Sequence, residues 1–195
     1  MDIGENIEKL AWKWIGAKPD DVDANSEFYC RTRDVFQTRL DRMLRNLLNA
    51  KNSGEENSYI VSAVAGEIGN NSFDHNLGNW RDVPGIFFDY YFSDDKIGVV
   101  LADRGQGILN TLKKVKPELA NDTEALKVAF TERISGRAPE NRGNGLKFVR
   151  ENVEQRKMHL DFYSGKAKAE LNDDIKIDET NEKIKGCLAI LNLKL

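Results

Sequence analysis

Two polar side chains in the middle of a helical stretch could bind a metal ion and activate a nucleophile. Glu67 and Asn71 stand four residues apart, so a helix projects both from one face, about one turn from each other. An amide oxygen is a suitable ligand for magnesium, and a carboxylate can take a proton from water or a hydroxyl. Alone, the pair also fits an ordinary solvent-exposed helix face. The segment is unusual, however, because residues 70–75 are polar except for Phe73, which is poor material for a helix interior.

A second candidate follows directly after a run of β-branched and apolar residues at 99–102. It consists of Asp103 and two alternate glycines, Gly105 and Gly107. Glycines adopt conformations that other residues avoid, and they let a ligand approach the backbone closely. A buried carboxylate can accept a hydrogen bond from an exocyclic amine such as that of adenine. Taken alone, the same residues also fit an ordinary strand-to-helix turn with a capping aspartate.

A third candidate lies where a polar loop runs into a helix. Arg142 precedes Gly143 and Gly145, which flank Asn144. Free backbone N–H groups at the start of a helix bind phosphate, and the arginine adds a positive charge. The segment lacks the Gly-Lys-Ser/Thr ending of a P-loop, and no βαβ unit surrounds it as a dinucleotide fingerprint requires.

In their order and separation, the three segments resemble those of the GHKL superfamily of ATPases, which includes histidine-kinase catalytic domains and anti-sigma-factor serine kinases. Residues 67–75 are similar to the family's N box, 103–107 to its Asp-x-Gly-x-Gly G1 box, and 142–146 to its Gly-x-Gly-Leu G2 box. The resemblance covers about residues 57–195. It implies the Bergerat fold, with an ATP lid between the last two boxes, and a stand-alone module most like the anti-sigma-factor serine kinases.

The resemblance implies ATP and Mg²⁺ as ligands, with each box supplying part of the site. The position of the catalytic base falls on Glu67, and the magnesium ligand falls on Asn71. Asp103 would bind the adenine amino group, and Cys187 stands where family members often carry a threonine near the adenine. The other residues expected to contact the nucleotide are Asp74, His75, Gly105, Gly107, Arg142, Gly143, Asn144, Gly145 and Leu146. His75 is expected to be a structural hydrogen-bonding partner rather than a catalytic group.

Two kinds of activity stay open at this point. In one, the protein is an enzyme that hydrolyses ATP or passes the γ-phosphate to a serine or threonine of a separate protein partner. In the other, it is a non-catalytic switch whose lid, residues 108–141, is ordered by ATP and controls binding of a partner. Glu67 favours the enzyme, because a pure binder needs no base. A self-phosphorylating histidine kinase is not expected, since the two histidines, His75 and His159, lie in the N box and in a predicted strand.

These candidates must be positioned by elements that hydrophobic periodicity predicts. We expect helices at about 7–15, 26–50, 56–77, 107–116, 122–133 and 145–156, and strands at about 85–92, 97–102, 159–163, 167–171 and 187–193. The mixture lacks βαβ regularity, which predicts an α+β fold: a two-layer α/β sandwich with a mixed, mostly antiparallel sheet and helices on one face. We divide the chain into an N-terminal helical extension, 1–55, and a histidine-kinase-like ATPase domain, 56–195.

Composition narrows the partners and the location. The net charge of −3 and the pI near 5.6 argue against a nucleic-acid partner, which would favour a basic face. The N-terminus lacks the features of a signal peptide and no apolar run approaches 18 residues, so we expect a cytoplasmic protein without a membrane span. Cys30 and Cys187 lie far apart and are expected to be buried hydrophobes. Trp12 and Trp14 could anchor a homodimer interface or a latch within the chain.

Overall fold

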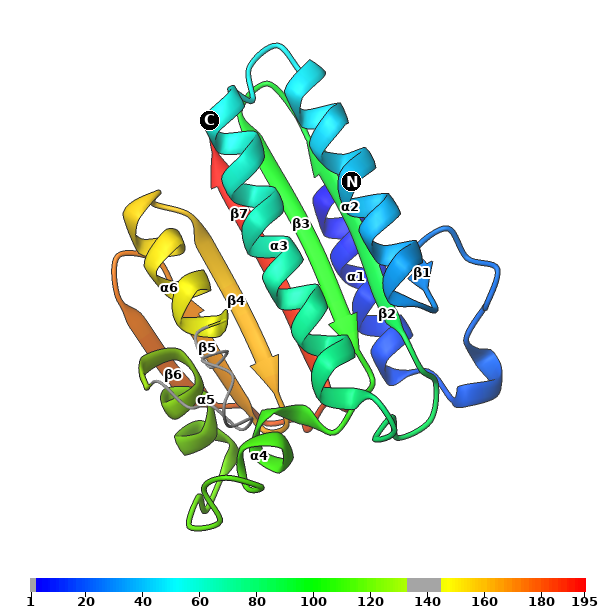
Figure 1. The fold of residues 1–195 in the computed structure, drawn as a ribbon, viewed down its shortest axis with the longest axis vertical. Coiled ribbons are helices and arrows are strands. Elements are labelled where there is room, and N and C mark those ends of the chain that lie inside the picture. Colours follow the sequence, from blue (N-terminus) through cyan, green and yellow to red (C-terminus); the bar gives the residue numbers. More distant parts are fainter. Residues whose placement is uncertain (1–2, 133–144) are drawn as a thin grey trace.

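Runs of aromatic and aliphatic residues build the centre of a seven-stranded sheet in the computed structural model, which describes residues 3–132 and 145–195 (Figure 1). The strand order is β1-β2-β3-β7-β4-β5-β6, and every pairing among these strands is antiparallel. The C-terminal strand therefore lies between the β2–β3 hairpin and the β4–β6 meander. The strands are β1 (Tyr29–Cys30), β2 (Ile86–Phe92), β3 (Lys96–Asp103), β4 (His159–Ser164), β5 (Ala167–Leu171), β6 (Ile175–Glu179) and β7 (Cys187–Lys194).

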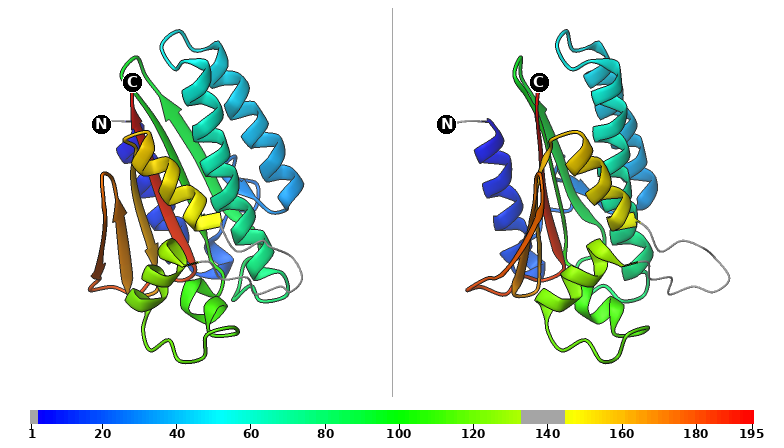
Figure 2. Two further views of the ribbon diagram at one scale, coloured as in Figure 1. Left: turned by 60° about the vertical axis from the view of Figure 1, so that its left-hand side comes forward. Right: turned by 90° about the vertical axis from the view of Figure 1, so that its left-hand side faces the viewer.

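Helices cover both faces of this sheet, but unequally. Viewed along the sheet, α2, α3, α5 and α6 lie on one face and α1 lies on the other (Figure 2). The helices are α1 (Ile3–Gly16), α2 (Arg33–Asn49), α3 (Glu55–Asn76), α4 (Gly107–Leu112), α5 (Asp122–Thr131) and α6 (Gly145–Gln155), with a short 3-10 turn at Pro19–Asp21. The predicted α+β sandwich is confirmed, but the sheet is antiparallel throughout rather than mixed, and the expectation of helices on one face is corrected because the apolar face of α1 forms a third layer behind the β2–β3 hairpin.

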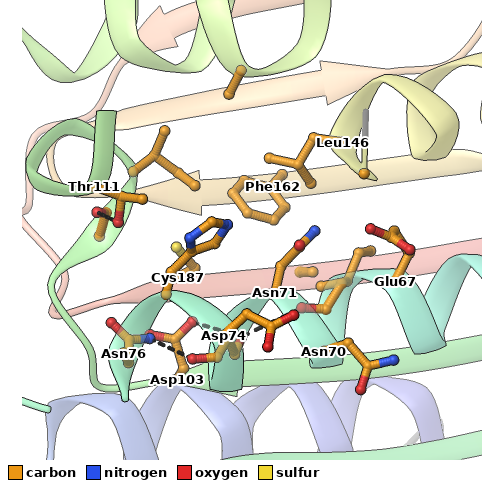
Figure 3. A pocket seen from close by; sticks show the side chains of 18 of the residues that line it. Glu67, Asn70, Asn71, Asp74, Asn76, Asp103, Thr111, Leu146, Phe162 and Cys187 are labelled. Carbon is orange, nitrogen blue, oxygen red and sulfur yellow. Dashed lines mark hydrogen bonds between the residues drawn. The ribbon is translucent and has the colours of Figure 1, made fainter. Parts of the chain in front are cut away.

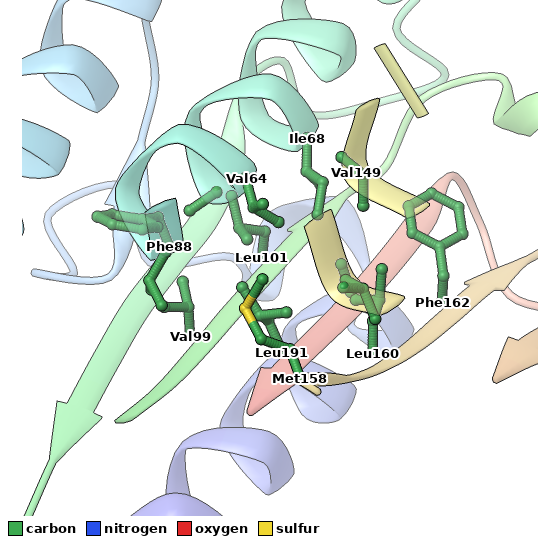
Figure 4. Packing of buried hydrophobic residues seen from close by; sticks show 14 of the residues in the cluster. Val64, Ile68, Phe88, Val99, Leu101, Val149, Met158, Leu160, Phe162 and Leu191 are labelled. Atoms are coloured by element: carbon green, nitrogen blue, oxygen red, sulfur yellow. The ribbon is translucent and has the colours of Figure 1, made fainter. Parts of the chain in front are cut away.

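The main core forms between the sheet and the larger helical layer (Figure 4). On α3, Val64 and Ile68 are buried against strand residues such as Leu101, and Val149 of α6 is fully buried beside them. Burying side chains of this size stabilises the fold by about 1.5–3 kcal/mol each. Because Ile68 points into the core, its neighbour Glu67 is directed along the side of α3 that faces α6.

Arg104 connects α1 to the end of β3 through hydrogen bonds. Its side chain is fully buried, and its guanidinium donates to Asp82 Oδ1 and Oδ2 at 2.9 and 2.8 Å. The remaining donors bind the backbone carbonyls of Trp14, Ile15 and Ala17 at the end of α1. All the donors of a guanidinium are thereby used, which is what a buried arginine requires. The hydrogen bond from Arg104 holds the pKa of Asp82 well below its ordinary value.

The N-terminal third differs from its prediction at one end of a helix. A helix was expected from residue 26, but α2 begins at Arg33, where Thr32 caps it by accepting the N–H of Val35 at 3.4 Å. The preceding residues Tyr29 and Cys30 instead pair with β2 as the edge strand of the sheet. The strand β6 was not predicted. The boundary at residue 55 stays a prediction, while α2 and β1 pack into the same core and sheet as the rest of the chain.

The tryptophans of α1 both contact the chain itself. Trp14 is 9% exposed and packs among Tyr29 and Phe87, and Trp12 meets the ring of Tyr163 edge-on with 5.0 Å between centroids. No helix among residues 3–132 and 145–195 has the length and apolarity needed to cross a membrane. The cytoplasmic location stays a prediction.

Candidate functional site

A cavity of about 910 Å³ opens between the end of α3, the sheet and the segments that contain α4 and the start of α6 (Figure 3). Residues from all three sequence candidates line it, although they are separated by dozens of residues in the chain. Within the described residues, the predicted site residues on its wall are Glu67, Asn71, Asp74, His75, Asp103, Gly107, Gly145 and Leu146. The tertiary structure therefore brings these side chains around a single space.

Asp103 is the most constrained acidic residue of the cavity. It ends β3, is 3% exposed, and binds two groups of different origin: the N–H of Gly105 at 2.8 Å and the hydroxyl of Ser72 at 2.9 Å. The Asn76 amide adds a longer bond of 3.4 Å. Burial raises the pKa of Asp103 from 3.8 to about 6, although these hydrogen bonds lower it. The carboxylate is thus held in a fixed plane at the cavity wall, where it can accept a donor from a ligand.

The two glycines after Asp103 have different structural roles. Gly107 has a φ of +77° and lines the cavity, in a backbone conformation that favours glycine. Gly105 lies behind the wall, and a Cβ built on it would lie 2.1 Å from the side chain of Asn76. Asn76 in turn accepts the N–H of Gln106 at 2.9 Å. The turn is therefore packed tightly against the end of α3, and Gly105 supports the cavity without contacting it.

Glu67 and Asn71 face the start of α6. A Cβ built on Gly145 would lie 2.1 Å from Oε1 of Glu67 and 2.8 Å from Nδ2 of Asn71, so the first residue of α6 contacts both side chains closely. Burial, and then repulsion from Asp74, raise the pKa of Glu67, while a hydrogen bond with Asn71 lowers it. A raised carboxylate pKa makes a better general base. The Asn71 amide and a partly buried carboxylate therefore lie side by side, as the helical spacing predicted.

Helix α2 reaches the same cavity, which the sequence did not reveal. The guanidinium of Arg33 binds Asp74 Oδ1 in an ion pair. One turn later, Gln37 Nε2 donates to Asn70 Oδ1 at 2.8 Å. Both α2 residues line the cavity. Helix α2 was expected only as part of an extension, so no local signal assigned these side chains to the site.

The part of the cavity next to Asp103 is largely apolar. Leu101 and Ile108 line it there, and Ala189 and Phe162 continue this apolar wall across β7 and β4, which gives a surface suited to a flat ring. Cys187 pairs with Asp103 across β3 and β7, and burial raises the pKa of its thiol well above the ordinary value. The thiol is therefore protonated near neutral pH and contributes a small, weakly polar surface.

Three predicted site residues are not described by the structure, and two residues that bind Asp103 were not predicted. Arg142, Gly143 and Asn144 lie outside the described residues, so their expected roles stay predictions. Ser72 and Asn76, which hold Asp103, were missed individually. Their signal was present, because the polar run in which they lie was already unusual for a helix and they stand four residues apart.

Comparisons with known proteins assign neither a family nor a function to this chain. No protein-family model and no curated protein matches this chain. Among solved structures, the ATPase region of Saccharomyces cerevisiae topoisomerase II is similar, with a TM-score of 0.40 and 13% sequence identity over 70% of this chain. This chain spans 38% of that one. A similarity of this size does not by itself assign a function.

Proposed function

We propose that this protein binds ATP with Mg²⁺ as a member of the histidine-kinase-like ATPase class, and either hydrolyses it or passes the γ-phosphate to a separate protein partner. The observation that carries the proposal is the convergence of three distant segments, represented by Glu67, Asp103 and Gly145, on one cavity of about 910 Å³. Pockets for small-molecule ligands commonly have volumes of about 300–1,000 Å³. Among the members of this class, the protein would be most like a stand-alone anti-sigma-factor serine kinase.

The adenine belongs beside Asp103 in this proposal. A carboxylate that is 3% exposed and fixed by Gly105 and Ser72 offers a hydrogen-bond acceptor in a dry environment, where such bonds are strongest. The exocyclic amine of adenine is a donor that matches it, whereas the carbonyl oxygen at the same position of guanine is an acceptor. The apolar wall that includes Ile108 and Phe162 suits the faces of the ring.

The phosphates belong at the other end, where Glu67, Asn71 and Gly145 meet. Magnesium usually takes few protein ligands, and shares the phosphate oxygens and water for the rest. Asn71 offers such an oxygen, and the part of the chain that the structure describes contains no cluster of three or more acidic, histidine or cysteine ligands that would suggest a different kind of metal site. When bound, the ion would neutralise phosphate charge. Glu67 would take a proton from water or a hydroxyl.

A second candidate function is a nucleotide-gated switch. It is favoured because α4 and the segment that follows it line part of the cavity. Thr111, Leu112, Lys114 and Val115 line the cavity although they belong to the expected lid. A bound nucleotide would contact these residues directly. Binding could therefore change the surface that this segment presents to a partner, without any turnover.

Incubation with γ-labelled ATP, alone and with the product of a neighbouring gene, separates these alternatives. Free phosphate indicates an ATPase, label on the partner indicates a kinase, and tight binding without either indicates a switch. Glu67→Gln serves as the matched variant, because it keeps the shape of the side chain and removes the base. It should bind ATP about as well as the wild type and lose turnover at least about a hundredfold. Full turnover in this variant would refute the base assignment, and absence of ATP binding by the wild type would refute the proposed function.

A further inference from the structure

The charges around the cavity do not suit a polyphosphate unless cations contribute. Among the residues that the structure describes, four carboxylates line the wall: Glu67, Asp74, Asp103 and Glu132. The lysine and arginine side chains on the same described wall are Arg33 and Lys114. Because a nucleoside triphosphate is strongly anionic, its binding here requires that cations offset the repulsion from these carboxylates.

Arg33 is placed at the end of the cavity where the phosphates would lie. It is the first residue of α2, and its ion-pair partner, Asp74, stands three residues after Asn71 on α3. The neighbouring bond from Gln37 to Asn70 ties the first turns of α2 to the same stretch of α3. The guanidinium is therefore held beside the stripe that contains Glu67 and Asn71.

The ion pair between Arg33 and Asp74 can be exchanged at little cost. The side chains are 45% and 38% exposed, and ion pairs this exposed are weakened by water and salt. A guanidinium also binds phosphate through two parallel hydrogen bonds, a geometry that a single carboxylate oxygen does not use fully. A phosphate entering beside Asp74 thus offers Arg33 a better partner within reach.

We propose that Arg33 is a phosphate-binding residue of this site, supplied by α2, which turns from Asp74 to the phosphates when the nucleotide binds. This inference rests on the proposed function, since it assigns the phosphates to the Glu67 and Asn71 end. It makes α2 part of the nucleotide site, and it predicts that Arg33 distinguishes nucleotides by the number of their phosphates.

Calorimetric titration of adenosine, ADP and ATP, the nucleotides with Mg²⁺, into the wild type and Arg33→Gln tests the assignment. Arg33→Gln should bind ATP about tenfold or more weakly, because one charge-assisted contact is lost, and should bind adenosine like the wild type. Arg42→Gln is the control, since it removes the same charge from an exposed position on the same helix that does not line the cavity. It should leave all three affinities unchanged.

The other possible results of this titration are also decisive. Equal losses for ATP and adenosine, or no loss for ATP, would overturn the role of Arg33 while leaving nucleotide binding intact. If the wild type binds none of the three ligands, the proposed function fails and this inference fails with it. If Arg33→Gln does not fold, Arg33→Lys decides instead: it keeps the charge but not the two parallel donors, so a loss confined to ATP and ADP supports the proposal and a uniform or absent loss refutes it.

Discussion

Replacement of Asp103 by asparagine should change both the pH dependence of stability and the affinity for ATP, because both depend on this carboxylate. The amide keeps the size of the side chain, and its oxygen can still accept the Gly105 N–H while its NH₂ group donates to the Ser72 hydroxyl. Folding should therefore survive the substitution. What disappears is the ionisation of a group that is 3% exposed.

The size of the effect follows from the pKa. Burial raises the pKa of Asp103 from 3.8 to about 6, which corresponds to about 3 kcal/mol between the protonated and ionised forms. Because the folded pKa lies above the unfolded one, this contribution to stability is fully present below pH 3.8 and is lost as the pH rises through about 6. The difference in unfolding free energy between Asp103→Asn and the wild type should therefore shift by about 2–3 kcal/mol in favour of the variant between pH 4 and pH 8.

Urea unfolding across this pH range measures the shift, and calorimetric titration measures the nucleotide. If Asp103 accepts the adenine amine, Asp103→Asn should bind ATP about ten- to a hundredfold more weakly, as expected for a lost hydrogen bond to a charged group. A stability difference that does not vary with pH would refute the raised pKa. Unchanged ATP affinity would refute the adenine assignment, whatever the stability data show.

Two further substitutions test the supports of the site. Asp82→Asn leaves Arg104 without its buried counter-charge and should lower the free energy of unfolding in urea by about 3–5 kcal/mol at neutral pH. Since the folded pKa of Asp82 is lowered, this loss of stability should shrink as the pH falls below 3.8. A loss that is constant with pH would contradict the ion pair. Gly145→Ala should change stability by less than about 1 kcal/mol, because the new methyl group displaces only the flexible ends of Glu67 and Asn71, but it should lower turnover at least about tenfold. Gly16→Ala, where a Cβ meets nothing within 4 Å, is the control, and equal turnover in both glycine variants would show that the close contact of Gly145 with Glu67 and Asn71 is unimportant.

Much of the secondary structure was predictable because it depends on local pattern. The apolar stripe on α3 and the aromatic and aliphatic runs of β2 and β3 predicted elements whose ranges match the structure within about one residue. The prediction failed where tertiary pairing overrides helical periodicity. Residues 26–32 continue an amphipathic pattern, but Tyr29 and Cys30 gain more by joining β2 at the edge of the sheet, and Thr32 then starts α2.

The predictability of the site followed the same division. Spacing on one helix placed Glu67 and Asn71 side by side, because residues four apart lie on the same helical face wherever that helix packs. The contribution of Arg33 was invisible, since it depends on how α2 packs against α3. The opposite roles of two adjacent residues were also hidden: Asp103 faces the cavity, while Arg104 is buried under α1 on the other side.

From its residues alone, this protein has three segments whose chemistry suits a metal ion, an amine and phosphates, together with helices and strands of defined order. These properties are local, because periods of 3.6 and 2 residues and the conformational freedom of glycine act over a few positions. Only the folded chain decided that the described parts of these segments surround one cavity, that α1 closes the opposite face, and that α2 supplies an arginine to the wall. Those outcomes depend on strand register and helix packing between residues far apart in sequence, where burial of the whole core selects one arrangement.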